Sequence, residues 1–554
     1  MQEKLAAGAG RHLTIPGYPF NIEKDVIRSG EIGMSKRPYE KKKHVKNGVM
    51  RVAFAILAGL VEISVLLVLI MMGSYRWKLV SVGIEIVGFI VVLLIYSQER
   101  TASLKIPWII FILTIPGFGL LMYVFVGLSA SFLGLYKRYR TIEKKLKPYR
   151  QKSDDSLHRL KEIDSRNTGV GVYLQKTIGY GLYDDSDITY FGETTECLDD
   201  MIANLEKAEK FIFMEYYAIE NSTAFGRILD VLSAKVKEGV LVRVFYDDLG
   251  SISFVDMSFA KMLRDRGIEC RTFNPFSFFF NVFLNNRDHR KIMVIDGKIG
   301  YTGGFNLANE YFHITKPYGD WKDAGVRIEG KAVRALTLIF LENWNALRKR
   351  KQGEADYNFS IYLPDYEYIP REKTFIQPYG DSPMDNEQTG ENVYLNIISK
   401  AEDYVYISTP YLIITDEMVS ALTLAAKRGV DVCLITPGIP DKKFIYSMTR
   451  SYYHMLARDG VRIFEYTPGF NHCKLCVADD CVATCGTFNF DYRSLYHNFE
   501  DGCIFYHCDA VMKEKEDLLE MMSVSREVTK KYEGKRAGML RAGQVILRLI
   551  APLL

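Results

Sequence analysis

The sequence predicts an α/β protein made of two pseudo-symmetric halves, each a mixed sheet flanked by helices, behind a helical membrane segment. Three observations lead to this prediction. Strand-like and helix-like segments alternate from about residue 170 onward. The same order of segments, ending in the same short motif, occurs twice in that region. Three long apolar runs precede it.

The chain has 554 residues, which is too many for one hydrophobic core, so several folded units are expected. Hydrophobic residues make up 48% and charged residues 25%, an ordinary globular mixture with a formal net charge of +4. The expected divisions are a basic cytoplasmic N-terminal tail (1–47), a membrane segment of two or three helices (48–130), a basic juxtamembrane linker (131–168), the first half (169–368), the second half (369–537) and a C-terminal amphipathic tail (538–554).

The membrane prediction depends on the runs Val52–Gly73, Trp77–Tyr96 and Ile106–Leu128. Each is about as long as the roughly 20 residues that cross a bilayer as a helix. Some fifty mostly polar residues come before the first run, which is unlike a cleavable signal peptide.

Lysine and arginine residues flank the apolar runs on both sides, which by the positive-inside rule puts both ends in the cytoplasm. An even number of crossings is then required. The third run carries Pro116, Gly117 and Gly119 near its middle, so we expect it to be bent or re-entrant. The basic residues after it, from Lys137 to Arg150, suit a stop-transfer flank and also contact with anionic lipid.

The repeat begins with two strand-like segments, Lys210–Glu220 and Asp403–Ile414. Each is followed by a segment of helical period that ends in Gly-Val, then by a second strand, a second helix and a third strand. This alternation predicts a layered fold with a largely parallel sheet in each half.

The closest internal match is the motif around His289 and His472. One constant offset also links four further pairs of residues: Lys291 and Lys474, Asp296 and Asp479, Gly303 and Gly486, Asn306 and Asn489. Five matches at a single offset are hard to attribute to chance. A His-x-Lys sequence that occurred once would be read as an ordinary strand position.

The residue types in this motif suit phosphate chemistry. His289 and Lys291 are two apart on an expected strand, so both side chains leave the same face. One histidine can attack phosphorus while the other protonates the leaving alcohol. The two lysines, Asn306 and Asn489 would donate to phosphoryl oxygens. No metal constellation accompanies them, so we predict none.

Two carboxylates are candidates for orienting the histidines. Asp323 and Glu500 hold corresponding positions, each just before an expected strand. A nucleophilic histidine usually needs a carboxylate on its second ring nitrogen. A surface carboxylate before a strand is nearly as frequent an explanation for either residue taken alone.

Nine cysteines are present, and four of them cluster as Cys473, Cys476, Cys481 and Cys485. Their spacing fits no common zinc pattern. We expect reduced cysteines packed in a core.

With these residues in view, the chain resembles the phospholipase D superfamily, whose motif His-x-Lys-x4-Asp occurs here twice and intact. More narrowly it resembles the bacterial cardiolipin synthases, from about residue 50 to the end. The matching phrases are YDDLGS (Tyr246–Ser251), GGFN (Gly303–Asn306), TPYLIITDEM (Thr409–Met418), GTFNFDYRS (Gly486–Ser494) and the final APLL.

The resemblance implies that two phosphatidylglycerol molecules give cardiolipin and glycerol through a phosphohistidine, without a cofactor. It implies His289 as the nucleophile and His472 as acid then base, although the pseudo-symmetry of the sequence leaves this assignment open. Asp296 and Asp479 complete the two candidate catalytic sets, with mainly structural or orienting roles in the family. The implied partners are phosphatidylglycerol, other anionic phospholipids and the cell membrane, with no nucleic acid and with an oligomer left open.

Other functions use the same residues. A phospholipase D hydrolase or a nuclease would take water as acceptor, and a nuclease would not need three apolar runs. A non-catalytic membrane scaffold would be expected to carry damaged motifs, and phosphatidylethanolamine is an alternative substrate. The C-terminal tail could be a short interfacial helix or a helix packed on the catalytic body.

Overall fold

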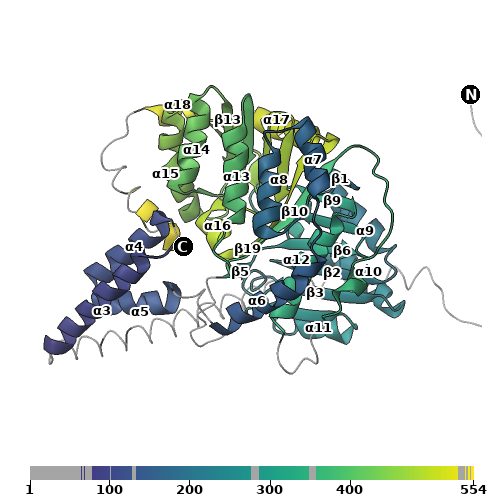
Figure 1. Cartoon of the computed structure of the whole chain (residues 1–554), viewed down its shortest axis with the longest axis horizontal. Helices are drawn as coiled ribbons and strands as arrows, with labels where there is room; N and C mark the ends of the chain where they lie inside the picture. The colour runs from purple at the N-terminus through teal and green to yellow at the C-terminus, as the bar shows by residue number, and fades with distance from the viewer. Residues whose placement is uncertain are drawn as a thin grey trace, which may run out of the picture.

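The structure is a computed structural model with two sheets side by side and a group of helices projecting from one flank (Figure 1). It describes residues 78–99, 101–127, 133–275, 286–348 and 357–534, with isolated positions at 64, 68, 543, 547–549 and 551–553. The N-terminal tail and nearly all of the first apolar run lie outside the described residues.

The first half contains a seven-stranded sheet in the order β1-β9-β7-β6-β2-β3-β4. Only the pairs β2–β3 and β3–β4 are parallel, and the other four pairs are antiparallel. The strands are β1 (Ser186–Phe191), β2 (Phe211–Tyr216), β3 (Leu241–Asp247), β4 (Glu269–Phe273), β6 (Lys291–Ile295), β7 (Ile299–Gly303) and β9 (Gly325–Gly330).

The second half repeats this order as β10-β19-β17-β16-β11-β13-β14, with β20 (Ser525–Glu527) added at the edge. The repeat predicted from the sequence is therefore confirmed. The strands are β10 (Phe375–Asp381), β11 (Tyr404–Ser408), β13 (Asp431–Pro437), β14 (Arg462–Tyr466), β16 (Leu475–Ala478), β17 (Val482–Gly486) and β19 (Asn498–Tyr506).

The expectation of a largely parallel sheet is wrong. The motif strand of each half, β6 or β16, turns directly into its neighbour as a hairpin, and strands joined by a tight turn are antiparallel. Parallel pairing is limited to the strands whose connections contain helices.

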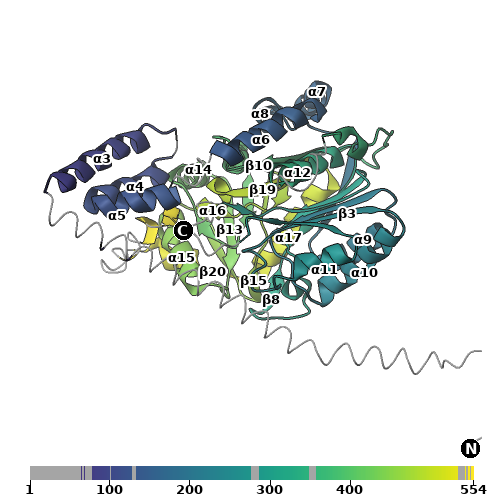
Figure 2. The ribbon, with the colours of Figure 1, turned by 90° about the horizontal axis from the view of Figure 1, so that it is seen from below.

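Helices cover the sheets on both faces (Figure 2). Helix α12 is almost wholly buried, with only Arg334 outside its buried set, because it packs between the first sheet, β10 and α6. The covering helices are α9 (Thr194–Leu205), α10 (Thr223–Lys237), α11 (Phe259–Asp265) and α12 (Val333–Ala346) in the first half, and α13 (Thr389–Lys400), α14 (Asp416–Lys427), α15 (Lys443–Arg458) and α17 (Asp509–Ser523) in the second.

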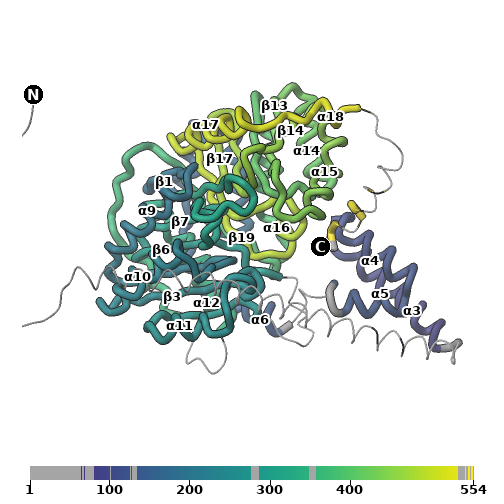
Figure 3. The backbone as a smooth tube through the Cα atoms, turned by 180° about the vertical axis from the view of Figure 1, so that it is seen from behind, coloured from purple at the N-terminus to yellow at the C-terminus, as the bar shows by residue number. Residues whose placement is uncertain are grey.

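Two short strand pairs join the halves. β5 (Arg287–Asp288) pairs with β19 of the other half, and β8 (Asp320–Lys322) pairs with β15 (Gly469–Asn471). The two halves consequently lie side by side along a long seam (Figure 3). Each of these pairs immediately precedes a residue of the repeated motif or its candidate carboxylate.

The segment predicted as a juxtamembrane linker forms helices that pack on the two-sheet body. α6 (Leu133–Leu146) lies on α12 through buried Tyr139, whose hydroxyl donates to Asn343 Oδ1 at 2.8 Å. α7 (Asp154–Ile163) and α8 (Thr168–Tyr173) follow it. The basic side chains of α6 are on its exposed face.

The third apolar run is bent, as expected from its proline and glycines. α4 (Ala102–Thr114) ends before α5 (Pro116–Met122), and the chain reverses, so that the rings of Trp108 and Tyr123 lie 5.4 Å apart. A Cβ atom on Gly119 would stand 2.7 Å from the Cα atom of Ile112, so this close approach requires glycine. We call α4 and α5 the hairpin; α3 (Lys78–Tyr96) packs against both of its arms.

Within the ranges that the structure describes, no helix combines the length and the apolar character needed to cross a membrane. The described part of the C-terminal tail packs on protein. Residues Ala551–Leu553 contact α4, and the Arg548 guanidinium lies 5.2 Å from the centre of the Tyr452 ring.

Candidate active site

The two motif histidines lie just outside the central strands. The sequence places them on strands, but β6 begins at Lys291, two residues after His289, and β16 begins at Leu475, three residues after His472. Each histidine follows a short strand that pairs with the other half. The His289 N–H donates to the Phe499 carbonyl at 2.9 Å, and the His472 N–H donates to the Lys322 carbonyl at 2.8 Å.

The side chains of the histidines are held crosswise. His289 Nδ1 lies 2.8 Å from Glu500 Oε2, and His472 Nδ1 lies 2.6 Å from Asp323 Oδ2. Each carboxylate therefore comes from the half that does not supply the histidine. With Nδ1 engaged by a carboxylate, Nε2 is the ring nitrogen left for chemistry.

Both imidazoles belong to one electrostatic environment. Burial first, and then the ammonium groups of Lys291 and Lys474, hold the pKa of each histidine well below its usual value. His289 contributes further to lowering the pKa of His472. The two histidines therefore lie within electrostatic reach of the same two lysines, at the seam between the halves.

The motif lysines are buried against the backbone of the histidines. Lys291 Nζ donates to the His289 carbonyl at 2.6 Å, and Lys474 Nζ lies 2.9 Å from His472 Nδ1 and donates to the His472 carbonyl. Burial lowers the pKa of Lys291 to about 7 and also lowers that of Lys474. Lys291 can therefore lose its charge near neutral pH.

The two carboxylates have different surroundings. Glu500 Oε1 accepts from the Ser494 hydroxyl and from Asn498 Nδ2 at 3.2 Å. Asp323 Oδ1 accepts from the Ala324 N–H at 2.9 Å, and a Cβ atom on Gly304 would collide with it. Burial raises the pKa of each carboxyl group to about 7. The two histidine–carboxylate pairs occupy equivalent positions in the fold, but different groups donate hydrogen bonds to their carboxylates.

Aromatic rings lie against both histidines, and no motif in the sequence assigned them. The Tyr217 ring stands edge-on to His289 with centres 4.9 Å apart, and the Tyr311 ring stands edge-on to His472 at 5.3 Å. Trp321 lies 5.6 Å from His472. The only sequence signal for any of them is that Tyr217 belongs to the strand phrase EYY.

The repeated asparagines do not contact the histidines directly. Each forms a hydrogen bond with a residue that contacts a histidine or its carboxylate. Asn306 Nδ2 donates to the Tyr311 hydroxyl at 2.7 Å, while its Oδ1 accepts from the Ala218 N–H at 3.1 Å. The Asn489 N–H donates to Ser494 Oγ at 2.9 Å, and its Oδ1 has no hydrogen-bond partner in the described part of the chain. Phosphate binding by these two residues stays a prediction.

The motif aspartates lie at the opposite ends of the motif strands from the histidines, where they accept hydrogen bonds from backbone N–H groups. Asp296 follows the far end of β6 and accepts hydrogen bonds from the N–H groups of Glu209, Lys210 and Phe211 at 2.7–2.8 Å. Asp479 accepts in the same way from residues 402–404. A strand of five residues separates Asp296 from His289, roughly 16 Å at about 3.3 Å per residue, so contact with the reacting group is not expected.

All nine cysteines are free and buried, including the four that cluster in the sequence. Packing in a core, as expected, accounts for them. Within the described ranges, no three histidine, cysteine or acidic side chains form a group that could hold a metal ion.

The family model and the named relatives in the comparisons with known proteins agree on one family. A family model described as cardiolipin synthase, PLD-like domain, matches residues 201–336 and 394–522, which contain the two motifs. A cardiolipin synthase of Staphylococcus aureus is 32% identical over 83% of this chain and 93% of its own length. A cardiolipin synthase of Clostridium perfringens is 32% identical over 82% of this chain and 95% of its own.

An uncharacterized protein of Streptococcus mutans is 40% identical over 84% of this chain and 99% of its own length. Among solved structures, phosphatidylserine synthase of Haemophilus influenzae superimposes with a TM-score of 0.49 at 14% identity, over 66% of this chain and 95% of that one.

Proposed function

The chain belongs to the cardiolipin synthase family, and from this premise we propose that it transfers a phosphatidyl group from one phosphatidylglycerol to another, giving cardiolipin and glycerol. The observation that carries the proposal is the crosswise pairing of His289 with Glu500 and of His472 with Asp323. This pairing supports the action of two imidazoles on one phosphorus atom, which a two-step transfer requires.

The first step forms a phosphohistidine. Nε2 of one histidine, assigned to His289 by family resemblance, attacks the phosphorus of the donor lipid and forms a P–N bond. The P–O bond to the glycerol headgroup breaks, and His472 gives its proton to the departing oxygen. Lys291 and Lys474 stabilise the added negative charge on the phosphoryl oxygens.

The second step reverses these roles. His472 takes the proton of a hydroxyl group on the acceptor phosphatidylglycerol, whose oxygen attacks phosphorus. The P–N bond then breaks, cardiolipin is formed, and both histidines return to their starting state.

The electrostatics of the site support these roles. A nucleophilic imidazole must be neutral, and burial with two nearby ammonium groups favours the neutral form of His289. An arriving phosphodiester offsets those positive charges. Burial and the same two ammonium groups also lower the pKa of His472, so His472 holds the proton for the leaving group only after the phosphodiester has offset those charges. Burial raises the pKa of Asp323 to about 7, and this carboxyl group lies against the His472 ring.

The test is incubation of purified protein in detergent with phosphatidylglycerol labelled at its phosphate. We expect labelled cardiolipin and released glycerol. Phosphatidic acid as the sole product would instead identify a phospholipase D hydrolase, and no turnover of any lipid would support a scaffold. An acid-labile protein adduct that is retained in His472→Ala but lost in His289→Ala would assign the nucleophile.

The proposal also includes a multi-pass position in the cell membrane, with the catalytic body on the cytoplasmic side. α3 supports it, because apolar side chains dominate its exposed surface; those at least half exposed include Val82, Ile86, Val87, Phe89, Ile90, Leu93 and Leu94. The exposed basic face of α6 suits anionic headgroups at the surface.

The reversal at Pro116 supports a re-entrant hairpin rather than a third crossing. Single cysteines at Ser103 and Ser131 would then react with a membrane-impermeant thiol reagent from the same side. The nine native cysteines are buried, so labelling of the introduced thiols can be read directly. Labelling from opposite sides would contradict the re-entrant geometry.

A further inference from the structure

The residue between the histidine and the lysine of the motif differs between the two halves. It is Arg290 in the first copy and Cys473 in the second. Both side chains are buried, at 0% exposed. A buried thiol needs no partner, whereas a buried guanidinium keeps its charge and is costly unless hydrogen bonds and counter-charges compensate it. The partners of Arg290 therefore indicate its role.

The Arg290 guanidinium binds the main chain at three places. Its Nε donates to the Glu500 carbonyl at 3.2 Å, and its Nη2 donates to the Asp381 carbonyl at 3.1 Å. Its Nη1 donates to the Ile339 carbonyl of α12 at 3.3 Å. Asp381 and Glu500 are register partners in the antiparallel pair of β10 and β19, so Arg290 holds both strands at one level of the sheet.

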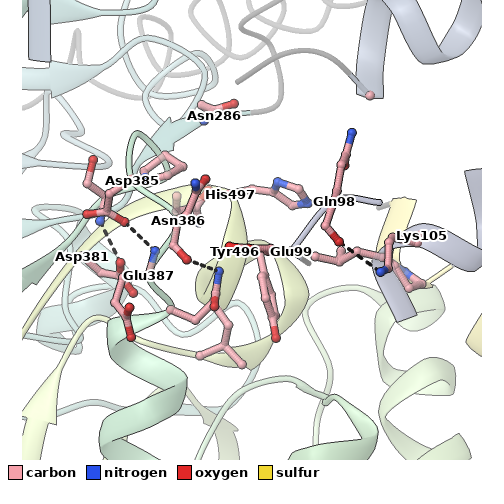
Figure 4. Close-up of a pocket in the computed structure, with 18 of the residues that line it drawn as sticks. Gln98, Glu99, Lys105, Asn286, Asp381, Asp385, Asn386, Glu387, Tyr496 and His497 are labelled. Carbon is pink, nitrogen blue, oxygen red and sulfur yellow. Dashed lines mark hydrogen bonds between the residues drawn. The ribbon is translucent and has the colours of Figure 1, made fainter. Parts of the chain in front are cut away.

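This level is where β19 passes from its own sheet to the other half. The pairing of β17 with β19 ends at Gly502, and the pairing of β5 with β19 covers Asn498 and Phe499, so Glu500 lies between the two pairings. Asp381 is the last residue of β10 and reaches the wall of a cavity of about 80 Å³ where α3 and α4 meet the two-sheet body (Figure 4). The hydrogen bonds of the guanidinium therefore fix the main chain of Glu500 at a change of strand partner.

Two buried carboxylates balance the charge of Arg290. Glu215 Oε1 lies 3.8 Å from its Nη1, and Glu342 Oε2 lies 3.6 Å from its Nη2. These distances exceed the range of hydrogen bonds, whereas the distances to the three carbonyls lie at its upper end. The main chain consequently orients the guanidinium, and the two carboxylates compensate its charge.

The corresponding residues of the second half are uncharged. Ser408 on β11 corresponds to Glu215 on β2, because each pairs with the residue three positions after the histidine of its half. Ser408 Oγ accepts from Asn471 Nδ2 at 2.8 Å. Cys473 has no N–H donors in its side chain, so it cannot supply to Asp323 the contact that Arg290 supplies to Glu500.

We infer that Arg290 is a positioning residue for His289, which acts by fixing the main chain of Glu500. Glu500 Oε2 lies 2.8 Å from His289 Nδ1, and a shift of about 1 Å would break this hydrogen bond. A misplacement of that size can slow a reaction about 10²-fold. The inference rests on the proposed function for the reaction in which His289 acts, whereas the contacts of Arg290 are independent of it.

The test is a double-mutant cycle with full-length protein and phosphatidylglycerol in detergent. Arg290→Lys keeps the charge but replaces a planar set of donors by one ammonium group, so kcat should fall about 10–100-fold at an unchanged KM. Because Arg290 acts through Glu500, the same change in a Glu500→Gln protein should lower kcat less than about twofold. The matched control is Arg327→Lys, a mostly buried arginine on β9 with two carboxylate partners, which should leave kcat unchanged.

Arg290→Gln is a second variant, which also removes the charge, and its kcat should fall at least as far as that of the lysine variant. Melting temperatures separate misfolding from lost positioning. Equal loss of kcat in the normal and Glu500→Gln proteins, a full rate in Arg290→Lys, or loss of folded protein in both Arg290 variants would overturn the inference.

The outcome for the proposed function is read from the product of the same reaction. Phosphatidic acid in place of cardiolipin would contradict phosphatidyl transfer to a second lipid, and the cycle would still test Arg290, because the step at His289 is common to both reactions. Cardiolipin formed by proteins in which the effects of Arg290→Lys and Glu500→Gln multiply independently would contradict the role of Arg290 alone.

Discussion

At the scale of single residues, the site is defined by an exchange of carboxylates. Glu500 from the second half contacts Nδ1 of His289, and Asp323 from the first half contacts Nδ1 of His472. In the proposed transfer, each buried carboxylate would fix which ring nitrogen faces the substrate and would favour the protonated ring. Burial, and after it the two lysines, lower the pKa of both rings.

Glu500→Gln should therefore lower kcat by about 10²–10⁴-fold, because an amide cannot stabilise the charged imidazole. Asp323→Asn tests the other pair in the same way. Steady-state rates on phosphatidylglycerol micelles provide the measurement, with exposed Glu516→Gln on α17 as the control. If Glu500→Gln kept the normal rate, Glu500 would have no orienting role.

The pH dependence should follow Lys291. Its pKa is lowered to about 7 by burial, so it is charged below pH 7 and neutral above it. The loss of this charge weakens binding of the anionic phosphate, and kcat/KM should fall as pH rises through about 7. Lys291→Arg keeps its charge, so the fall should move to higher pH in that variant. An identical profile for both proteins would exclude Lys291 as the titrating group.

At the scale of elements, each strand of the motif carries chemistry at one end and structure at the other. The histidine precedes β6 or β16, whereas the aspartate follows it and binds three backbone N–H groups ahead of β2 or β11. Asp296 and Asp479 also have positive φ, which suits the tight turn into the next strand. The spacing between the histidine and the aspartate of each motif therefore corresponds to the length of one strand.

Asp296→Ala should lower the free energy of unfolding by about 2–4 kcal/mol, because three charge-assisted hydrogen bonds are lost. The protein that remains folded should keep most of its kcat. Denaturant unfolding and active-site titration of the same sample separate the two effects. Asp265→Ala, at an exposed position on α11, is the control; a large loss of kcat without loss of stability would place Asp296 in the chemistry.

At the scale of the whole molecule, neither half holds a complete site. The strand pairs β5–β19 and β8–β15 cross the seam, and each histidine backbone bonds to the opposite half. The N-terminal helices add a further layer, because their contact with the body forms the cavity next to Asn498.

If one chain supplies the whole site, two inactive variants should not restore activity when they are mixed. Purified His289→Ala and His472→Ala proteins, combined in shared micelles, should remain below about 1% of normal activity, since removal of one catalytic group typically costs at least 10²-fold. Co-expression of the two variants followed by the same assay checks exchange during folding. Recovery toward a quarter or half of normal activity would mean that the halves pair between chains.

The sequence by itself determined the duplicated α/β plan, the two His-Lys-Asp sets and the bend at Pro116, because repeats, strand periodicity and proline are local signals. It also named Asp323 and Glu500 from their corresponding positions. Only the tertiary structure decided that each carboxylate serves the other half's histidine, that the sheets are mostly antiparallel, and that Tyr217 and Tyr311 wall the site. The exchange of carboxylates depends on strands that meet across the seam and bring together residues 149 and 211 positions apart, and no local pattern encodes such a pairing. The antiparallel order comes from the hairpins that β6 and β16 form with the next strand of their own half.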